Sequence, residues 1–161
     1  MIEAWTAALE ATAIAGALRG SVWAYPLVNA GHLLGVALLI GSIVPLDLRL
    51  LGLWPSVPLA HLWRVLTRTA GIGLGITIAC GALLFITRAT DYVNSSLFIS
   101  KMTIVVVGTV NALLLHSAVP DDRLLACWTD SKPPTHVRSA AGISLATWLL
   151  ALTLGRLVGY F

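Results

Sequence analysis

Apolar residues fill four long stretches of the chain, and charged residues are confined to the segments between them. No Asp, Glu, Lys or Arg occurs within residues 20–46, 69–87, 102–120 or 139–155. A helix that crosses the hydrocarbon core of a bilayer needs about 20 mostly apolar residues. The pattern therefore predicts four membrane-spanning helices, at about residues 22–46, 66–88, 98–119 and 138–158.

The first residues follow a different pattern. Residues 2–19 mix small apolar side chains with a few charges and carry Trp5, which is typical of an amphipathic helix lying at the membrane interface. Glu3 and Glu10 make this opening acidic, whereas a secretory signal begins with basic residues. We therefore expect the first span to be retained, with Pro45 as a kink near its end.

Turn-forming residues separate the spans. Gly52, Pro55 and Pro58 mark a turn after the first span, and polar loops are expected at 91–96 and 121–136. The amphipathic segment HLWRVLTR indicates that the second helix begins before its apolar part. The predicted fold class is all-α: a single domain, residues 1–161, forming an integral membrane four-helix bundle preceded by a short interfacial amphipathic helix.

Composition agrees with a membrane protein. Of the 161 residues 58% are hydrophobic and 11% charged, and the mean hydropathy is +0.90, so little charge is left to cover a soluble surface. The net charge of +3 suits loops that face anionic lipid, and no basic run indicates nucleic-acid binding. Six of the Lys and Arg residues lie on the side of the first and third loops and four on the other, which predicts both termini outside.

Glycines recur at a spacing of four residues in several spans. The pairs are Gly31/Gly35, Gly71/Gly75 and Gly155/Gly159. This spacing lets helix backbones approach closely in lipid. Simple bundle packing is one interpretation, and room for a flat macrocycle between the helices is the other.

Two histidines lie inside predicted spans, where an ionisable group is costly and indicates a functional site. His32 is deep in the first span, and either donates a hydrogen bond to the next helix or is an axial ligand of haem b. His116, toward the end of the third span, either extends to the interface or is the second axial ligand. The two histidines are expected at different depths, which weighs against a shared haem.

Lys101 opens the third span, as an interfacial anchor or as an inward-pointing haem ligand or propionate partner. His61 is expected on a solvated face, and His136 in a loop. Asp47 and Arg49 are two residues apart and so do not face each other on a helix. Each is expected to tether to another helix or loop, for example Asp47 to Arg64 or Arg68.

Several runs resemble known membrane proteins. They are WAYPLVNAGHLLGVALLIGSIVPLDLRLLG at 23–52, FISKM at 98–102 and NALLLH at 111–116. With these runs the chain resembles, over nearly its whole length, an uncharacterised family of small bacterial four-helix membrane proteins. More distantly it is similar to the CopD copper-resistance membrane domain and to the HemJ-type protoporphyrinogen oxidase.

The oxidase resemblance implies haem b, with His32 and Lys101 at the positions of that family's essential His and Lys. The DLRLL run at 47–51 replaces the oxidase's PRLF-type ending, so the resemblance implies haem binding and does not extend to oxidase activity. Compared with CopD, the loops lack the Met- and His-rich cluster that would capture copper.

The sequence thus predicts a b-type haem protein of the bacterial inner membrane that exchanges electrons with quinone or a partner redox protein. His32 is the expected axial ligand and His116 or Lys101 the second, with Arg19, Lys101 or Arg68 neutralising the propionates. The alternatives are a cofactor-free accessory subunit, within a homo-oligomer or a larger membrane complex, and a CopD-like copper transport module.

Overall fold

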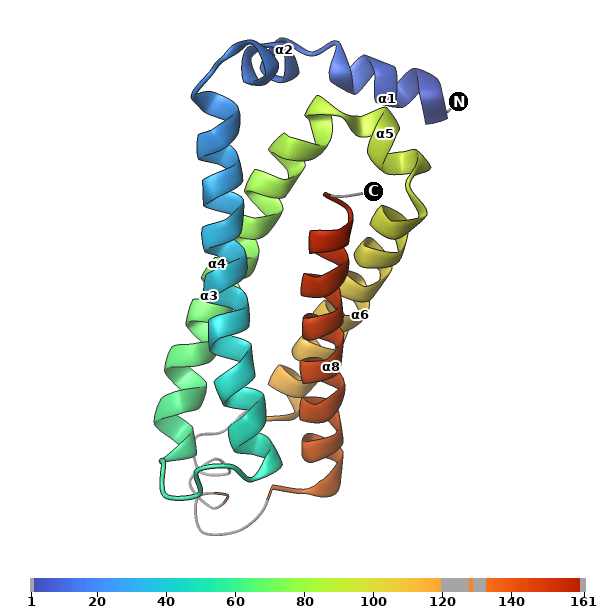
Figure 1. Ribbon diagram of the computed structural model, residues 1–161. Helices are drawn as coiled ribbons and strands as arrows, with labels where there is room; N and C mark the ends of the chain where they lie inside the picture. Colours follow the sequence, from blue (N-terminus) through green and yellow to red (C-terminus); the bar gives the residue numbers. More distant parts are fainter. Residues whose placement is uncertain (1, 120–127, 129–132, 160–161) are drawn as a thin grey trace.

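The computed structural model describes residues 2–119, 128 and 133–159 (Figure 1). These residues form helices and no strand, so the all-α prediction is confirmed. The helices are α1 Ile2–Glu10, α2 Ala13–Gly20, α3 Ala24–Leu51, α4 Leu59–Thr87, α5 Ala89–Asn94, α6 Ser96–Ala118 and α8 Thr135–Leu157.

Four helices are long and apolar enough to cross a membrane. They are α3, α4, α6 and α8, with 28, 29, 23 and 23 residues and mean hydropathies of 2.0, 2.1, 1.9 and 1.4 in their most apolar windows. The chain is therefore a multi-pass membrane protein. The helices of the first two spans extend beyond their predicted apolar limits, since α3 continues through Pro45 to Leu51 and α4 begins at Leu59.

Local signals end and begin these helices. Gly52 stops α3 because it adopts a left-handed conformation, φ 111°, in which its N–H and that of Leu53 bond to the last carbonyls of the helix. Ser95 caps α6 by accepting a hydrogen bond from the Phe98 N–H. The predicted loop at 121–136 lies mostly outside the described residues.

Two details of the prediction were wrong. The single interfacial helix at 2–19 is two helices, because the Thr12 side chain caps a new helix by accepting from the Ala15 N–H. The polar loop expected at 91–96 is instead largely the short helix α5. The aromatic ring of Tyr92 on this helix packs against Phe85 and Phe98. Figure 1 shows α1 and α2 lying across one end of the bundle.

The four long helices pack as two pairs joined through α3 and α8. Helix α3 runs along α4, α6 runs along α8, and α3 also contacts α8. The described parts of α4 and α6 meet only through side chains, since Trp63 stacks on His116 and Phe85 on Phe98 while the two backbones stay apart. The closest approach is between α3 and α4, where a Cβ on Gly35 would lie 2.7 Å from the Thr77 backbone nitrogen. A Cβ on Gly73 would lie 2.6 Å from the Leu39 nitrogen.

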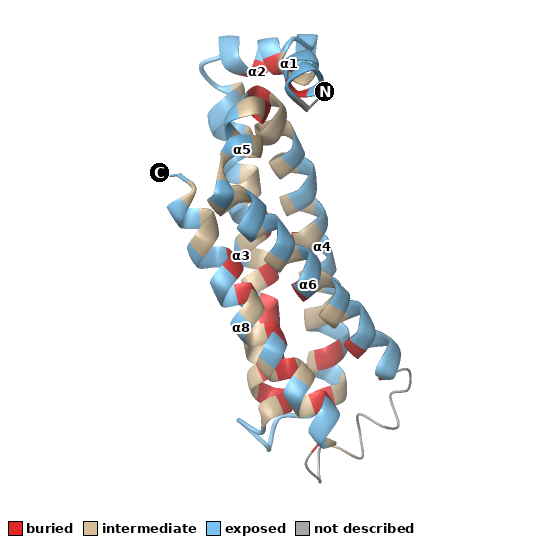
Figure 2. Ribbon diagram, turned by 90° about the vertical axis from the view of Figure 1, so that its right-hand side faces the viewer, coloured by how far each residue is buried: buried red, intermediate tan, exposed pale blue. Residues whose placement is uncertain are grey.

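The core lies in one half of the bundle (Figure 2). We call the half next to the α3–α4 connection the loop-side half: residues 39–51, 59–74, 108–118 and 135–148. It holds the main buried clusters, including Leu50, Trp63 and Trp148. In the opposite, terminal-side half (24–38, 75–87, 96–107 and 149–157) the buried residues are Gly35, Thr87 and Ala151. The bundle is therefore closed at one end and thinly packed at the other.

Candidate functional site

His32 lies on α3 in the terminal-side half and faces α4. Its Nδ1 is 3.0 Å from the backbone oxygen of Thr77. A carbonyl oxygen only accepts, so Nδ1 carries the proton and donates, and the lone pair of the neutral ring is on Nε2. The predicted hydrogen bond to the next helix is thus present, and it leaves the second nitrogen available to a ligand.

The glycines around His32 serve helix packing. A Cβ on Gly31 would lie 3.0 Å from the Cys80 sulfur, and Gly35 packs against Thr77. Across from the histidine, a Cβ on Gly81 would lie 3.2 Å from the imidazole Cε1. The bundle-packing interpretation therefore holds for Gly31 and Gly35, and the ring of His32 is held against the backbone of α4.

Lys101 is a charged residue of the terminal-side half, the half that also holds His32. It is half-buried on α6, and its Cε would lie 3.4 Å from a Cβ on Gly155 of α8. It therefore points toward the neighbouring helix. The acidic side chains within the described part of the chain lie elsewhere: Glu3 and Glu10 on the interfacial helices, Asp91 on α5 and Asp47 in the loop-side half.

His116 belongs to a different region from His32. It lines a cavity in the loop-side half, and its ring is parallel to that of Trp63, with 6.0 Å between centroids and 4° between planes. Asp47 lines the same cavity and follows His32 by fifteen residues on α3, about 22 Å along the helix. The structure does not bring the two histidines to one site.

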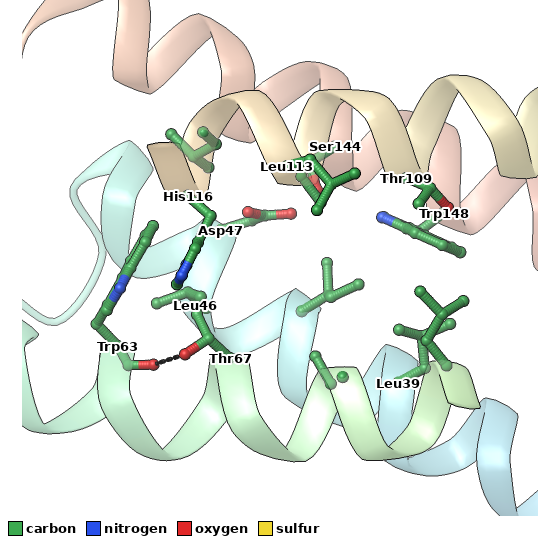
Figure 3. Close-up of a pocket in the computed structure, with 16 residues that line it drawn as sticks. Leu39, Leu46, Asp47, Trp63, Thr67, Thr109, Leu113, His116, Ser144 and Trp148 are labelled. Carbon is green, nitrogen blue, oxygen red and sulfur yellow. Dashed lines mark hydrogen bonds between the residues drawn. The ribbon is translucent and has the colours of Figure 1, made fainter. Parts of the chain in front are cut away.

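The cavity has a volume of about 190 Å³ and is lined by residues of all four long helices (Figure 3). Its walls are mostly apolar, with a few polar side chains. The lining residues that matter for its chemistry are Asp47 from α3, Trp63, Thr67 and Gly71 from α4, Leu113 and His116 from α6, and Ser144 and Trp148 from α8.

Two buried polar atoms at this cavity have no hydrogen-bond partner. Asp47 is 2% exposed and its Oδ2 is unpartnered, although the Ser144 side chain interacts with the carboxyl group. Trp148 is 3% exposed and its Nε1 is also unpartnered. The residues that line the cavity thus carry one unpaired acceptor and one unpaired donor. By contrast, the Thr67 hydroxyl donates to the Trp63 carbonyl at 2.6 Å, as Figure 3 shows.

The tethers expected near Asp47 are formed only in part. Arg49 is 2% exposed and donates from Nε to Val57 O and from a terminal nitrogen to Pro55 O, both at 3.0 Å. It therefore closes the α3–α4 loop as expected. Oδ2 of Asp47 takes no such partner: the carboxyl group faces α8 and the cavity.

The remaining candidates have other surroundings. His61 is exposed, as predicted, and His136 is exposed in the first turn of α8 rather than in a loop, because that helix begins at Thr135. Arg19 donates to Thr87 O and Glu10 O. No group of three His, Cys, Asp or Glu that could hold a metal ion occurs among the described residues.

Sequence reasoning missed Trp63, Ser144 and Trp148 as members of one site. A signal was present, because Ser144 and Trp148 are four residues apart and so share a helix face. The spacing does not tell which helix faces Ser144 and Trp148. In the structure that helix is α3, which places Asp47 opposite Ser144.

Comparisons with protein-family models, with curated proteins and with solved structures found no match to this chain. The family resemblance and the haem ligands inferred from it therefore stay predictions. The described residues form two candidate regions, His32 with Lys101 in one half of the bundle and the cavity around Asp47 in the other.

Proposed function

We propose that this protein binds haem b between its membrane helices and passes electrons between a quinone and a partner redox protein. The observation that carries the proposal is the hydrogen bond from His32 Nδ1 to the Thr77 carbonyl. Such a bond to the outer nitrogen fixes the tautomer and orientation of a metal-binding histidine and makes Nε2 more basic. When bound, haem supplies reversible one-electron exchange at its iron.

The surroundings of His32 support the same proposal. The terminal-side half contains few buried side chains, so its helices are thinly packed. Lys101 brings a positive charge to this half, and the acidic side chains that the structure describes lie on other helices. A buried charge is stabilised by an opposite one, and a haem propionate provides it.

The second axial ligand is proposed to be Lys101 rather than His116. Lys101 lies in the same half as His32 and packs against Gly155 of α8, whereas His116 lies against Trp63 in the other half. Arg19 is a poorer propionate partner than Lys101, since its guanidinium already binds the Thr87 and Glu10 carbonyls. Lys101 thus acts as ligand or as propionate partner, and the spectrum distinguishes the two.

The test is the absorbance spectrum of the detergent-purified protein, oxidised and dithionite-reduced, after expression with added haem precursor. We expect a Soret band and a reduced α band that His32→Ala abolishes and His116→Ala leaves intact. Lys101→Met should shift the bands if Lys101 is a ligand, and lower haem retention without a shift if it holds a propionate. A colourless wild-type protein, or a His32→Ala variant with an unchanged spectrum, would refute the proposal.

An accessory subunit without cofactor is the second candidate. Gly41, Gly71 and Gly75 are exposed, and a Cβ on any of them would meet nothing within 4 Å. Exposed glycines on spanning helices let another helix approach closely. Colourless protein that co-purifies at fixed stoichiometry with a larger membrane complex would support this candidate. The localisation proposed with either function is the bacterial inner membrane, with both termini outside.

A further inference from the structure

The cavity of the loop-side half lacks hydrogen-bond partners that its own polar atoms require. Leaving a buried donor or acceptor unpaired costs about 1–3 kcal/mol, more for a charged group. Folded proteins therefore satisfy nearly all such atoms, by protein, water or ligand. Asp47 Oδ2 and Trp148 Nε1 both remain unsatisfied and both belong to residues that line this cavity.

The positions of these two residues define the missing group. Asp47 interacts with Ser144, and Trp148 follows Ser144 by four residues, about 6 Å along α8. In Figure 3 the nitrogen end of the Trp148 indole is turned toward the side where Asp47 lies. A hydroxyl group has the chemistry that both atoms lack, because it donates to a carboxylate and accepts from an indole N–H.

The size of the cavity sets the size of the molecule that carries the hydroxyl. An apolar protein cavity of about 150 Å³ holds a benzene molecule. The volume here is about 190 Å³, which is enough for a six-membered ring with small substituents. The mostly apolar walls suit the faces of such a ring.

The exposed residues of the lining show where the cavity opens. Its lining residues on α3 and α8 are all buried, whereas the exposed ones are Gly71 on α4 and Leu113 and His116 on α6. Between these exposed residues α4 and α6 approach each other only through side chains, such as the stacked rings of Trp63 and His116, and their described backbones stay apart. Because both are candidate spans, the opening faces lipid, and a ligand enters from the bilayer.

We infer that this cavity binds the ring of a membrane quinol, with one ring hydroxyl between Asp47 and Trp148. Lipid-side entry, an aromatic-sized apolar space and a paired acceptor and donor are together the requirements of that class. The hydroxyl proton passes to Oδ2, which leaves a bound quinolate and a neutral Asp47 carboxyl group. Binding and this proton transfer need no haem; only the later departure of electrons rests on the proposed function.

A photoreactive azido derivative of a short-chain quinone tests the site in protein reconstituted into lipid nanodiscs. Labelled peptides are identified by mass spectrometry, and reduced short-chain quinone is added as competitor. We expect saturable labelling of the lining segments, residues 63–74 and 109–116, with protection by the quinol. Labelling confined to other segments, or no saturable labelling because the cavity holds only water, would overturn the inference.

Two glycines on one helix give a matched pair of variants. A Cβ on Gly71 or on Gly75 meets nothing within 4 Å, and only Gly71 lines the cavity. Gly71→Leu should lower the labelling at least tenfold by filling the entrance, and Gly75→Leu should leave it unchanged. Equal labelling of both variants contradicts the site.

The polar pair is tested separately. Asp47→Asn and Trp148→Phe keep the shapes of the side chains, and each should raise the quinol concentration needed for protection about tenfold, as expected for one lost hydrogen bond. Unchanged protection in both variants would remove the hydroxyl assignment.

The absorbance spectrum of the same sample reports haem independently. Saturable labelling of colourless protein would refute the haem proposal alone, and a Soret band without labelling would refute the quinol site alone.

Discussion

Asp47 and Arg49 are two residues apart on one helix and have different environments. The guanidinium of Arg49 binds two carbonyls of the loop that follows α3, and the carboxyl group of Asp47 faces the cavity between the helices. Both side chains are 2% exposed, yet one is satisfied and the other is not. At the scale of single residues, this contrast separates a structural charge from a candidate functional one.

Replacement of Arg49 by Gln should destabilise the protein. The shorter neutral side chain cannot bridge Val57 O and Pro55 O, and two charge-assisted hydrogen bonds are lost. We expect the free energy of unfolding to fall by about 2–4 kcal/mol, measured by circular dichroism during denaturation in detergent. Arg68→Gln removes a charge at the same end from an exposed position and serves as the control. An equal loss in both variants would mean that charge at this end matters and the loop contacts do not.

The sequence pointed to His32 but not to the arrangement around it. A histidine deep in an apolar span stands out without any structure, because its burial needs a partner. That its Nδ1 is bonded to Thr77 depends on how α3 is rotated against α4. Whether His32 pairs with His116 or with Lys101 depends on the same geometry, because residues on different helices are close only if their depths agree.

At the scale of elements, α3 and α4 pack closely because the glycines at their contact carry no side chain. Gly35 and Gly73 bring the two backbones so close that a Cβ on either would lie less than 3.0 Å from backbone atoms of the other helix. Lipid gives no hydrophobic drive for helix association, so such packing supplies much of the attraction. The Thr77 carbonyl that binds His32 lies at this contact.

Gly35→Ala should therefore force the two helices apart. We expect a loss of about 1–3 kcal/mol in the free energy of unfolding, as for other overpacked sites. Gly41→Ala, on the same helix but with nothing within 4 Å of its Cβ, should be neutral or stabilising by up to about 1 kcal/mol because alanine favours the helix. The comparison is made by denaturation in one detergent. Equal stability of the two variants would show that the close contact does not hold the pair.

Hydropathy predicted the spans because length and charge alone decide whether a helix can cross a bilayer. It could not predict the helix rotations, since lipid-facing and interior positions are equally apolar: Leu113 is exposed and Leu115 is buried two residues later. The short helix α5 was missed for a related reason. Its sequence, ATDYVN, reads as polar, and aromatic contacts of Tyr92 with Phe85 and Phe98 hold it in place.

At the scale of the whole molecule, the interfacial helices cover the thinly packed end of the bundle. The Thr90 N–H donates to the Glu10 carboxylate at 2.7 Å, and Arg19 joins Glu10 O to Thr87 O. These contacts attach α1 and α2 to the junction of α4 and α5. The end of the half that holds His32 is therefore covered by polar contacts together with a few buried residues, such as Ala15, Leu18 and Ala89.

Attachment of these helices should depend on pH through Glu10. The hydrogen bond from the Thr90 N–H lowers the pKa of Glu10, so the docked state favours the ionised carboxylate. The stabilisation is complete above the ordinary glutamate pKa of about 4.3 and is lost as the pH falls through the lowered value. Hydrogen exchange of residues 2–20 should thus be faster at pH 3 than intrinsic rates account for. Glu10→Gln should exchange faster at neutral pH and lose this pH dependence, and Glu3→Gln, at an exposed position, should behave as wild type. If Glu10→Gln kept the wild-type pH dependence, protonation of another group would have to control the docking.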